Sequence, residues 1–478
     1  MRVDEPAPNV GPSTVVGEPQ PTAIRDFGHD TNHVMTMNSL FGTDGIRGRA
    51  LEWPLDRDTV QRLGAALAEV LAEECPEPRI LLAGDTRAST ETLAGWLAGS
   101  FQVHGGKVTW GGILPTPAVS QLLRIDGCVA GVVISASHNP AHDNGIKILG
   151  TGGEKIADDR ERRLEARISE ILPEHGPDLP EIDHSLGERY LQILIDSHEA
   201  RRPLDGLHIV VDAANGAASG IAQQLLERLG ARVTAIASDP DGHNINDGCG
   251  ATSPQRLAET VAASGADGGI ALDGDADRAL LVDEAGRVMD GDDILLGWGR
   301  HLHKLGRLPG DRVVATVMSN FGLEKALNEE GIEMVRCPVG DRAVWLTMSE
   351  RGAALGGEQS GHVICSHHAV TGDGLLTGTH LLAIAAERRI PVSQLSDLER
   401  MPQVLLNIPV PRKLPFDQLP TISRELADTE RSLVGRGRVL LRYSGTEALA
   451  RVMVEGEDAA EIEGLADRLA NAIRSELT

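Results

Sequence analysis

The sequence predicts a multidomain α/β protein in which three related α/β domains precede a smaller α+β domain. The chain has 478 residues, more than the roughly 250–300 that one hydrophobic core accommodates. Three segments, 79–112, 208–238 and 312–341, repeat one pattern: an apolar strand, a polar turn, a helix with apolar residues three or four apart, a glycine and a second strand. Such units fold with a crossover helix packed on a sheet, which predicts three domains of one type. Chance similarity is the alternative, because this pattern is common.

The last part of the chain has a different pattern. A proline-containing connector at 410–415 precedes a helical segment, a hairpin-like stretch at 438–456 and an amphipathic helix at 460–477. This order predicts a smaller α+β domain.

Breaks between these patterns divide the chain into five segments. Residues 1–38 are rich in proline, glycine and polar residues and lack the basic start and apolar core of a secretory signal, which predicts a disordered extension. The four domains are expected at 39–184, 185–296, 297–398 and 399–478.

Composition and charge exclude some classes of partner. The chain has 70 acidic and 45 basic residues, a formal charge of −25, and 41% hydrophobic residues. Nucleic acids and anionic membranes select a basic face, so neither is expected as a partner. An acidic chain can still bind an anionic substrate where arginine, lysine and backbone N–H groups converge.

Cysteine usage and hydropathy indicate a cytoplasmic protein. The cysteines are odd in number, far apart and without a CxxC pair, as is typical of reduced thiols. They are Cys75, Cys128, Cys249, Cys337 and Cys365. No apolar run approaches the ~20 residues that span a bilayer.

A polar loop follows the apolar run that begins at Gly131. In its sequence SASHNP, Pro140 ends regular structure and Ser137 stands at the end of the expected strand. A serine so presented is a candidate nucleophile or phosphate carrier, and Lys147 follows at a distance that could return an ammonium group to it. The alternative is an ordinary turn with a solvated His138.

A second loop carries Asp273, Asp275 and Asp277 at i, i+2 and i+4. Alternate residues of an extended chain point the same way, so the three carboxylates would repel unless a cation neutralised them. Ligands that are all oxygen favour Mg²⁺. An EF-hand fits worse, because Arg278 stands where its glycine is needed. A surface acidic turn is the remaining alternative.

A third loop, GGEQSGHVI, contains Glu358, Ser360 and His362. Its glycines allow the backbone to approach a ligand closely, and the glutamate and serine can hydrogen-bond sugar hydroxyl or amino groups. A glycine-rich turn with a partly buried histidine gives the same sequence.

A fourth loop, RYSGTEALARV, contains Arg442, Ser444, Gly445 and Thr446. An arginine can hold a phosphate through two parallel hydrogen bonds, and the hydroxyls and backbone N–H groups around Gly445 can form an anion nest. A hairpin turn with a solvated arginine is the alternative.

Taken together, these loops contain the parts of a phosphoryl-transfer site. Arg47, Asp85 and Arg87 add polar groups near strand ends. A serine that carries phosphate, a carboxylate metal site, a polyol-binding loop and a phosphate clamp supply the positioning and charge neutralisation that phosphoryl transfer requires.

The motifs also resemble those of a known family, the α-D-phosphohexomutases, from Leu40 onward. They are SASHNP around Ser137, DGDADR at 273–278, GEQSGH at 357–362 and RYSGTE at 442–447. The start FGTDGIRG, Gln359 and the ending RVMVEG are most similar to the bacterial members that act on glucosamine phosphates. The resemblance implies three similar α/β domains with mixed sheets and a smaller fourth, arranged around a central cleft. It implies interconversion of glucosamine 6-phosphate and glucosamine 1-phosphate through a sugar 1,6-bisphosphate, which supplies UDP-N-acetylglucosamine synthesis.

The resemblance also implies the role of each residue. Ser137 is the phosphoserine, whose phosphorylation activates the enzyme, and it binds one Mg²⁺ together with Asp273, Asp275 and Asp277. The residues around the reacting phosphate are Arg47, His138, Lys147 and Arg278. The residues that bind the substrate are Glu358, Ser360, His362, Arg442, Ser444, Gly445 and Thr446. A homodimer would fit the family.

The sequence departs from the family in two places. Ala276 stands where many members have glycine, and its methyl group is expected to be tolerated if the residue does not have positive φ. In RYSGTEALA, Tyr443 removes a cation from the clamp and Ala448 removes a proline. These changes bear on affinity and loop rigidity.

Two other functions stay open. A phosphoglucomutase or phosphomannomutase would use the same chemistry on another sugar, with Gln359 as the distinguishing residue. A silent sugar-phosphate-binding protein would not need Ser137, the aspartates and Arg442 together.

Overall fold

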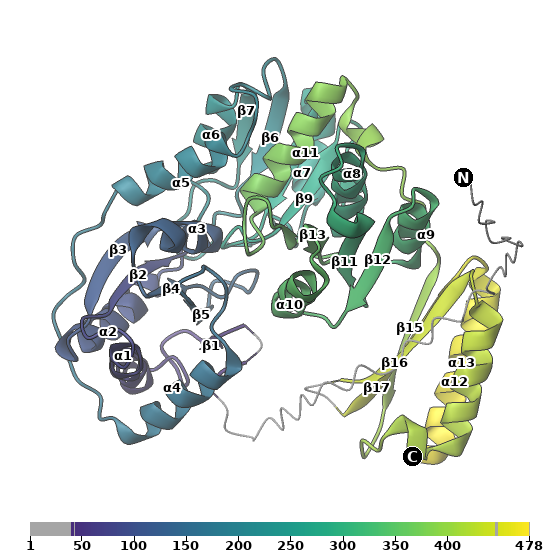
Figure 1. Cartoon of the computed structure of the whole chain (residues 1–478), viewed down its shortest axis with the longest axis horizontal. Coiled ribbons are helices and arrows are strands. Elements are labelled where there is room, and N and C mark those ends of the chain that lie inside the picture. Colours follow the sequence, from purple (N-terminus) through teal and green to yellow (C-terminus); the bar gives the residue numbers. More distant parts are fainter. Residues whose placement is uncertain (1–39, 43, 445–447, 478) are drawn as a thin grey trace, which may run out of the picture.

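A computed structural model of the chain describes residues 40–42, 44–444 and 448–477 (Figure 1). The extension expected at 1–38 lies outside the described residues, as do Gly445 and Thr446.

Domain 1 is built on a five-stranded sheet in the order β1-β5-β4-β2-β3. Its strands are β1 (Ile46–Arg49), β2 (Arg79–Gly84), β3 (Lys107–Ile113), β4 (Ala130–Ile134) and β5 (Asp143–Leu149). Its helices are α1 (Arg57–Ala72), α2 (Thr90–Val103), α3 (Thr116–Asp126) and α4 (Asp158–Glu170). The central strand β4 (AGVVI) is buried along its whole length, as expected for an apolar strand covered on both faces.

Domain 2 has a five-stranded sheet in the order β10-β9-β8-β6-β7. Its strands are β6 (His208–Asp212), β7 (Arg232–Ile236), β8 (Gly268–Leu272), β9 (Ala279–Asp283) and β10 (Val288–Met289). Its helices are α5 (Ser185–Asp196), α6 (Ala222–Arg228) and α7 (Gln255–Ser264).

Domain 3 has a four-stranded sheet in the order β12-β11-β13-β14. Its strands are β11 (Arg312–Thr316), β12 (Glu333–Cys337), β13 (Leu355–Gly357) and β14 (Val363–Cys365). Its helices are α8 (Gly291–Lys304), α9 (Phe321–Glu329), α10 (Asp341–Arg351) and α11 (Gly374–Arg388), with 3₁₀ turns at Pro309–Asp311 and Val392–Leu395.

The three sheets share a four-strand unit, which confirms the predicted relationship between the domains. In each, the first strand pairs in parallel with the second and the third, and the third pairs antiparallel with the fourth. The first-to-fourth strands are β2, β3, β4 and β5 in domain 1, β6 to β9 in domain 2, and β11 to β14 in domain 3. The sheets are therefore mixed, as expected.

The expected boundary between residues 296 and 297 falls inside α8. The helix continues through Gly297 and Gly299 to Lys304. A Cβ at Gly297 would lie 2.9 Å from the carbonyl oxygen of Leu395, so glycine allows close packing here.

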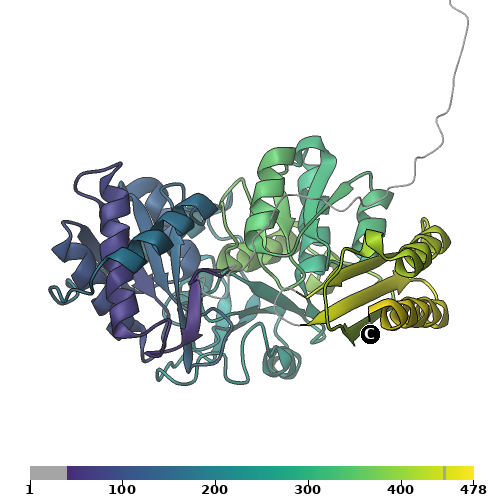
Figure 2. The same ribbon diagram turned by 90° about the horizontal axis from the view of Figure 1, so that it is seen from below.

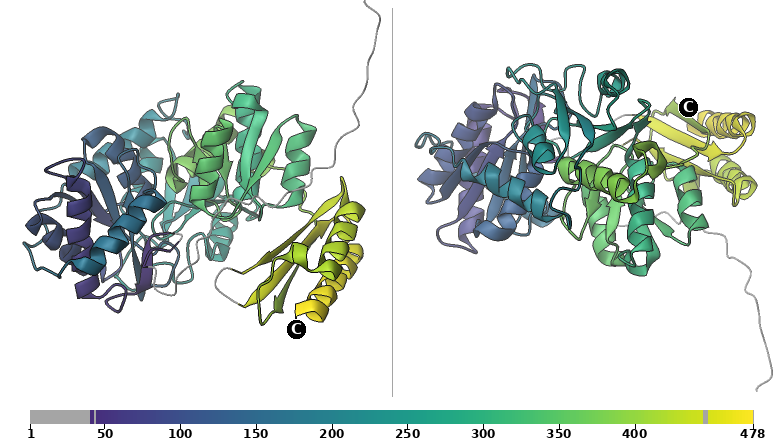
Figure 3. Two further views of the ribbon diagram at one scale, coloured as in Figure 1. Left: turned by 60° about the horizontal axis from the view of Figure 1, so that its bottom comes forward. Right: turned by 90° about the horizontal axis from the view of Figure 1, so that it is seen from above.

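Domain 4 is a three-stranded antiparallel sheet, β15-β17-β16, with two helices on one face (Figure 3). Its strands are β15 (Gln403–Pro409), β16 (Gly437–Tyr443) and β17 (Leu449–Gly456), and its helices are α12 (Pro420–Leu433) and α13 (Ala459–Leu477), after a 3₁₀ turn at Phe416–Gln418. The pairing of β16 with β17 confirms the predicted hairpin and the α+β class.

The first three domains share packing that domain 4 lacks. One cluster of buried apolar side chains continues from Leu81 to Leu398, whereas domain 4 has its own core between Ile408 and Leu477. Domain 4 stands at one end of the molecule in Figures 1 and 2. It contacts domain 3 through Arg438, whose guanidinium donates to the carbonyl oxygen of Val317 at 2.8 Å. No helix within the described ranges is both long and apolar enough to span a bilayer.

Candidate active site

The predicted loops of the first three domains occupy equivalent places in their sheets. Ser137 lies three residues after β4, Asp273 follows β8 directly, and Glu358 follows β13 directly. Each of these strands is the third of its shared unit, and each loop leads into the antiparallel fourth strand. The repeated topology therefore presents one polar loop from each domain.

The structure brings the serine loop and the aspartate loop together. The Ser137 hydroxyl donates to Asp273 Oδ2 at 2.6 Å, across the interface between domains 1 and 2, and lies 3.4 Å from His138 Nδ1. Ser137 is buried and has φ 54°, in the left-handed region that costs a non-glycine residue about 1–2 kcal/mol. Strain of this kind persists only where surrounding contacts hold it.

The three aspartates form a group that fits a divalent cation. Ligand atoms of Asp273, Asp275 and Asp277 all lie within 4.8 Å of one another, and all three residues are buried. Within the described part of the chain, Asp275 Oδ1 and Asp277 Oδ1 have no hydrogen-bond partner although both are buried. Burial and the charges of Asp277 and Asp275 raise the pKa of Asp273 well above its usual value. Buried, unsatisfied carboxylate oxygens are suitable ligands for Mg²⁺.

Lys147 neutralises part of this charge through direct contacts with the aspartates. Its Nζ lies 2.7 Å from Asp275 Oδ2, 3.4 Å from Asp277 Oδ2 and 3.3 Å from Asp44 Oδ2. Burial would lower the pKa of Lys147, but these carboxylates raise it well above 10.5, so the side chain is an ammonium ion. Burial would raise the pKa of Asp277, but Lys147 and His362 hold that pKa well below its usual value.

A cavity of about 490 Å³ opens beside the serine and is lined by residues of all three α/β domains. Arg47, His138 and Arg278 line it, together with Glu358 and His362 from domain 3. Arg47 Nη1 donates to the carbonyl oxygen of Ala136 at 3.1 Å, and Arg278 N donates to Asp273 Oδ1 at 3.2 Å. Burial, followed by the charges of Arg278 and Arg47, lowers the pKa of His138 below 6.5, which leaves the imidazole neutral at pH 7.

The domain 3 loop contributes residues of unequal exposure. Glu358 Oε1 accepts a hydrogen bond from Gly340 N at 3.0 Å, and Ser360 is exposed. His362 is 2% exposed, its Nε2 accepts from Gly372 N at 3.0 Å, and its Nδ1 lies 3.7 Å from Asp277 Oδ1. His362 therefore contacts the aspartate loop and is shielded from bulk solvent.

The domain 4 residues lie apart from this cavity. Arg442 is half-buried on β16, in register with Arg451 on β17, and burial followed by the charge of Arg451 lowers its pKa. Ser444 N donates to the carbonyl oxygen of Leu449 at 2.9 Å. Of the predicted domain 4 residues that the structure describes, neither Arg442 nor Ser444 lines the cavity.

A lysine that the sequence analysis missed lies beside the domain 4 clamp. Lys413 Nζ donates to the carbonyl oxygen of Ser444 at 2.5 Å. Tyr443 explains this approach, because its hydroxyl donates to the carbonyl oxygen of Leu414 at 2.7 Å and its ring stacks on Phe416 at 4.2 Å. Lys413, on the connector, thus supplies a cation at the end of β16, where Tyr443 replaces the cation of the commoner family motif.

The sequence analysis also missed Thr116 at the start of α3. Its hydroxyl donates to Asp275 Oδ2 at 2.5 Å, and its N–H donates to the carbonyl oxygen of Asp275 at 3.0 Å. A threonine followed by proline is a signal for a helix start, but nothing in the sequence relates that start to a loop more than 150 residues away.

The condition under which Ala276 was expected to be tolerated is not met. The residue has φ 57° and is fully buried, and its N–H donates to the carbonyl oxygen of Asp273 at 3.0 Å. The alanine therefore adopts the left-handed conformation that glycine adopts at lower cost.

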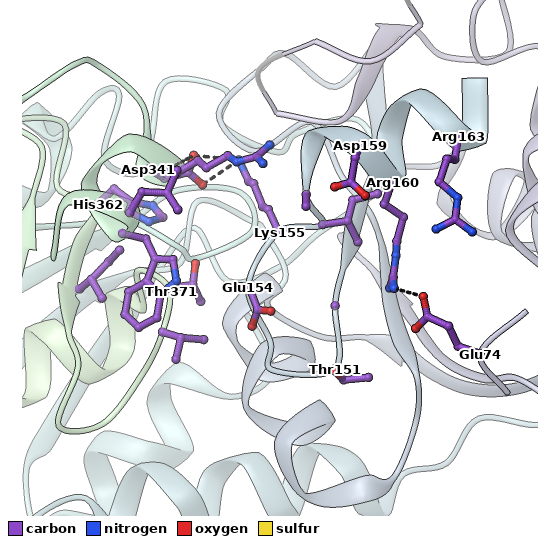
Figure 4. A pocket seen from close by; sticks show the side chains of 18 residues that line it. Glu74, Thr151, Glu154, Lys155, Asp159, Arg160, Arg163, Asp341, His362 and Thr371 are labelled. Atoms are coloured by element: carbon purple, nitrogen blue, oxygen red, sulfur yellow. Dashed lines mark hydrogen bonds and ion pairs between the residues drawn. The ribbon is translucent and has the colours of Figure 1, made fainter. Parts of the chain in front are cut away.

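A second cavity of about 430 Å³ lies between domains 1 and 3 (Figure 4). The ion pair between Lys155 Nζ and Asp341 Oδ2, at 2.7 Å, crosses from one domain to the other. Lys155 also contacts Asp44, and Asp341 lines both cavities. The sequence did not predict this ion pair, which links domain 1 to domain 3 beside both cavities.

The chain has three α/β domains and a smaller fourth. At the candidate site a serine faces buried carboxylates, and cations lie beside a cavity. This architecture and this site are those expected of the phosphohexomutase class that the sequence resembles. Comparison with known families matches each domain in turn. The matching descriptions are phosphoglucomutase/phosphomannomutase alpha/beta/alpha domain I at 38–174, domain II at 188–286, domain III at 290–401 and the C-terminal domain at 405–472. The chain belongs to the phosphoglucomutase/phosphomannomutase family.

Individual relatives cover nearly the whole chain. The phosphoglucosamine mutase of Solibacter usitatus is 44% identical over 444 residues, which are 92% of this chain and 99% of the relative. The phosphoglucosamine mutase of Solidesulfovibrio magneticus is 45% identical over 444 residues, 91% of this chain and 98% of the relative. Among solved structures, a phosphoglucomutase/phosphomannomutase family protein from Burkholderia thailandensis superposes with a TM-score of 0.77 at 26% identity, covering 92% of this chain and 97% of the other.

Proposed function

We propose that the protein interconverts glucosamine 6-phosphate and glucosamine 1-phosphate through a phosphorylated Ser137. The observation that carries the proposal is the contact of 2.6 Å between the Ser137 hydroxyl and Asp273, within a buried carboxylate group beside a cavity. Relatives named phosphoglucosamine mutase, 44–45% identical over more than nine-tenths of the chain, favour an amino sugar as the substrate.

Asp273, Asp275 and Asp277 would hold one Mg²⁺, with an oxygen of the phosphorylated Ser137 as a further ligand. When bound, Mg²⁺ acts as a Lewis acid that stabilises charge on a transferring phosphoryl group. Lys147 compensates the excess negative charge of the aspartates when the site carries a phosphate.

The first transfer follows from the positions of Ser137 and His138. The bond between Ser137 Oγ and phosphorus breaks while the free sugar hydroxyl forms a bond to phosphorus. The hydroxyl proton passes to the His138 imidazole, whose Nδ1 lies 3.4 Å from Ser137 Oγ, and from there to the serine oxygen. Arg47 and Arg278 line the cavity and stabilise the phosphate charge throughout.

The second transfer requires the sugar bisphosphate to turn and return its other phosphate to Ser137. Arg442 and Ser444, with Lys413 beside them, would hold the phosphate that is not reacting, and the family motif adds Gly445 and Thr446. Glu358 and Ser360 would contact the sugar hydroxyl and amino groups. Because domain 4 has its own core, it can close over the cavity without disturbing the reacting groups.

Activation by phosphorylation of Ser137, a cytoplasmic location and a homodimer belong to the same proposal. So does the supply of glucosamine 1-phosphate to UDP-N-acetylglucosamine synthesis. Membership of the family supports each of these points.

The test is a mutase assay on purified, phosphorylated protein with Mg²⁺, comparing glucosamine, glucose and mannose phosphates with and without EDTA. A strong preference for the amino sugar that EDTA abolishes is expected. Equal or better turnover of glucose or mannose phosphate would contradict the amino-sugar assignment. It would favour the second candidate function, the phosphoglucomutase/phosphomannomutase activity that the family description names.

A further inference from the structure

The loop that carries Ser137 is held by an arginine to which the proposed chemistry assigns no part. The Arg87 guanidinium is fully buried and bound to Asp85, with Nε donating to Oδ2 at 2.9 Å. Its Nη2 donates to the carbonyl oxygens of Ser137 at 3.0 Å and Asn139 at 2.8 Å. Its Nη1 donates to the carbonyl oxygens of Pro140 and Asp143. All five N–H donors are thus used, four of them on the backbone of one loop.

A second donor reaches the same backbone from domain 2. Asn246 Nδ2 donates to the carbonyl oxygen of Ser137 at 2.9 Å and to that of Asn139 at 3.1 Å. The Ser137 carbonyl oxygen therefore accepts one hydrogen bond from domain 1 and one from domain 2. The Ser137 N–H donates to Ser135 Oγ at 2.9 Å. Both ends of a left-handed residue are fixed.

We propose that Arg87 and Asn246 are positioning residues that hold the Ser137 peptide in its left-handed conformation, so that Oγ points at Asp273. The inference rests on the proposed function, because an Oγ aimed at the aspartates matters for phosphoryl transfer. Arg87 fixes the loop within domain 1. Asn246 ties it to domain 2, which also carries the aspartates, and so sets the distance between Ser137 and Asp273. A displacement of about 1 Å in such an arrangement can lower the rate about 100-fold.

Asn246 gives the cleaner test, because its own φ is 59° and glycine adopts that conformation freely. Asn246→Gly removes the amide while relieving backbone strain, so a purely structural role would not predict a loss of rate with unchanged stability. Asn246→Asp keeps the shape but presents an oxygen to the two carbonyl oxygens that the amide N–H₂ faced.

Asn215→Gly is the matched control. Asn215 also has positive φ, 48°, and its amide bonds stay within domain 2, to the carbonyl oxygen of Asn244 at 3.2 Å and from Asp239 N at 3.2 Å. The control loses the same group from the same backbone conformation without touching the Ser137 loop.

The experiment measures kcat, KM, the fraction of phosphorylated protein and thermal unfolding, and solves the crystal structures of Asn246→Gly and Asn215→Gly. We expect kcat of Asn246→Gly to fall about 10–100-fold with KM within threefold and no loss of stability, a larger fall for Asn246→Asp, and kcat of Asn215→Gly within twofold of wild type. The Ser137 Oγ should leave hydrogen-bond distance of Asp273 in Asn246→Gly only.

Two results overturn the positioning role: wild-type kcat in Asn246→Gly, or a crystal structure in which its Ser137 overlays that of the wild type. A wild-type protein that turns over no hexose phosphate instead overturns the proposed function. In that case the two crystal structures still decide whether Asn246 positions Ser137.

Discussion

The Ser137–aspartate region and the domain 4 clamp are built in opposite ways. At the first, buried groups from two domains compensate one another: Lys147 faces Asp275 and Asp277, and the Ser137 hydroxyl donates to Asp273. At the second, cations gather at the end of a hairpin, where Arg442 lies in register with Arg451 and Lys413 reaches the neighbouring carbonyl. The proposed reacting groups thus neutralise one another within the protein, whereas the proposed clamp gathers cations that the phosphate of a substrate would neutralise.

The difference predicts that changes in the first region lower kcat and that changes in the clamp raise KM. A group that acts only in the transition state affects kcat, while one that binds an unreacting phosphate affects both states alike.

The largest effect is expected for Ser137→Ala, which removes the group that carries phosphate. We expect kcat to fall by at least about 10⁴-fold, because the variant has no hydroxyl at position 137 to carry the phosphoryl group. Thermal unfolding should stay within a few degrees of wild type, because the lost side chain is small. Ser264→Ala, on the exposed side of α7, is the control. Substantial mutase activity in Ser137→Ala would contradict the mechanism.

Asp275→Asn should follow in size. Asp275 Oδ1 is buried without a hydrogen-bond partner among the described residues, while Oδ2 accepts from Thr116 and Lys147, so the substitution removes charge with little change in shape. We expect activity to fall about 10²–10⁴-fold at a fixed Mg²⁺ concentration and to recover in part as Mg²⁺ is raised. Activity measured across a Mg²⁺ titration checks this. An unchanged Mg²⁺ dependence would exclude the aspartates as the metal site.

The clamp should respond through KM. Arg442→Met is expected to raise KM about 10–100-fold, as the loss of charged hydrogen bonds to one phosphate would, and Lys413→Met to raise it less, with kcat within about threefold in both. Arg468→Met removes an exposed domain 4 arginine paired with Glu425 and should leave KM unchanged. A fall in kcat alone for Arg442→Met would place Arg442 among the reacting groups and contradict the predicted difference between the two regions.

The smallest effect, a change in the pH dependence of stability, is expected at a stack of histidines that takes no part in the proposed chemistry. His198 stacks on His380 at 4.2 Å, and His380 packs against His368 at 4.6 Å. Burial, and then the charge of His368, lowers the pKa of His198 to about 4. The unfolded chain, with the ordinary value near 6.5, binds the proton first as the pH falls, so folding stability is lost between pH 6.5 and about 4.

His198→Phe keeps the stack and removes the proton-binding group. Between pH 6.5 and 4 the variant should lose less unfolding free energy than wild type, by on the order of 2 kcal/mol. Denaturant unfolding across that pH range measures the difference, with the exposed His243→Phe as control. Parallel pH curves for wild type and His198→Phe would show that His198 keeps its ordinary pKa in the folded protein.

Local patterns were enough to predict the fold class and to bring most residues of the candidate site under consideration. The repeated strand–helix–strand segments fixed the relationship of three domains, and the spacing of Asp273, Asp275 and Asp277 pointed to a metal because all three ligands lie in one loop. The Ser137 loop was predictable for the same reason.

What could not be predicted depends on contacts between distant segments. Thr116 reaches Asp275 across more than 150 positions, and Lys413 reaches Ser444 only because Tyr443 holds the connector. The positive φ of Ala276 depends on the turn that its neighbours impose, and α8 runs through Gly297 because packing against Leu395 offsets the low helix propensity of glycine.

The most direct test of the central claim follows the phosphoryl group itself. Dephosphorylated protein is incubated with glucosamine 1,6-bisphosphate and Mg²⁺, and its intact mass and peptide map are recorded together with the released sugar phosphates. The account predicts the gain of one phosphoryl group on the peptide that contains Ser137 and the release of glucosamine monophosphates in equal amount. Phosphorylation at another residue, or release of sugar phosphate without any gain on the protein, would contradict it.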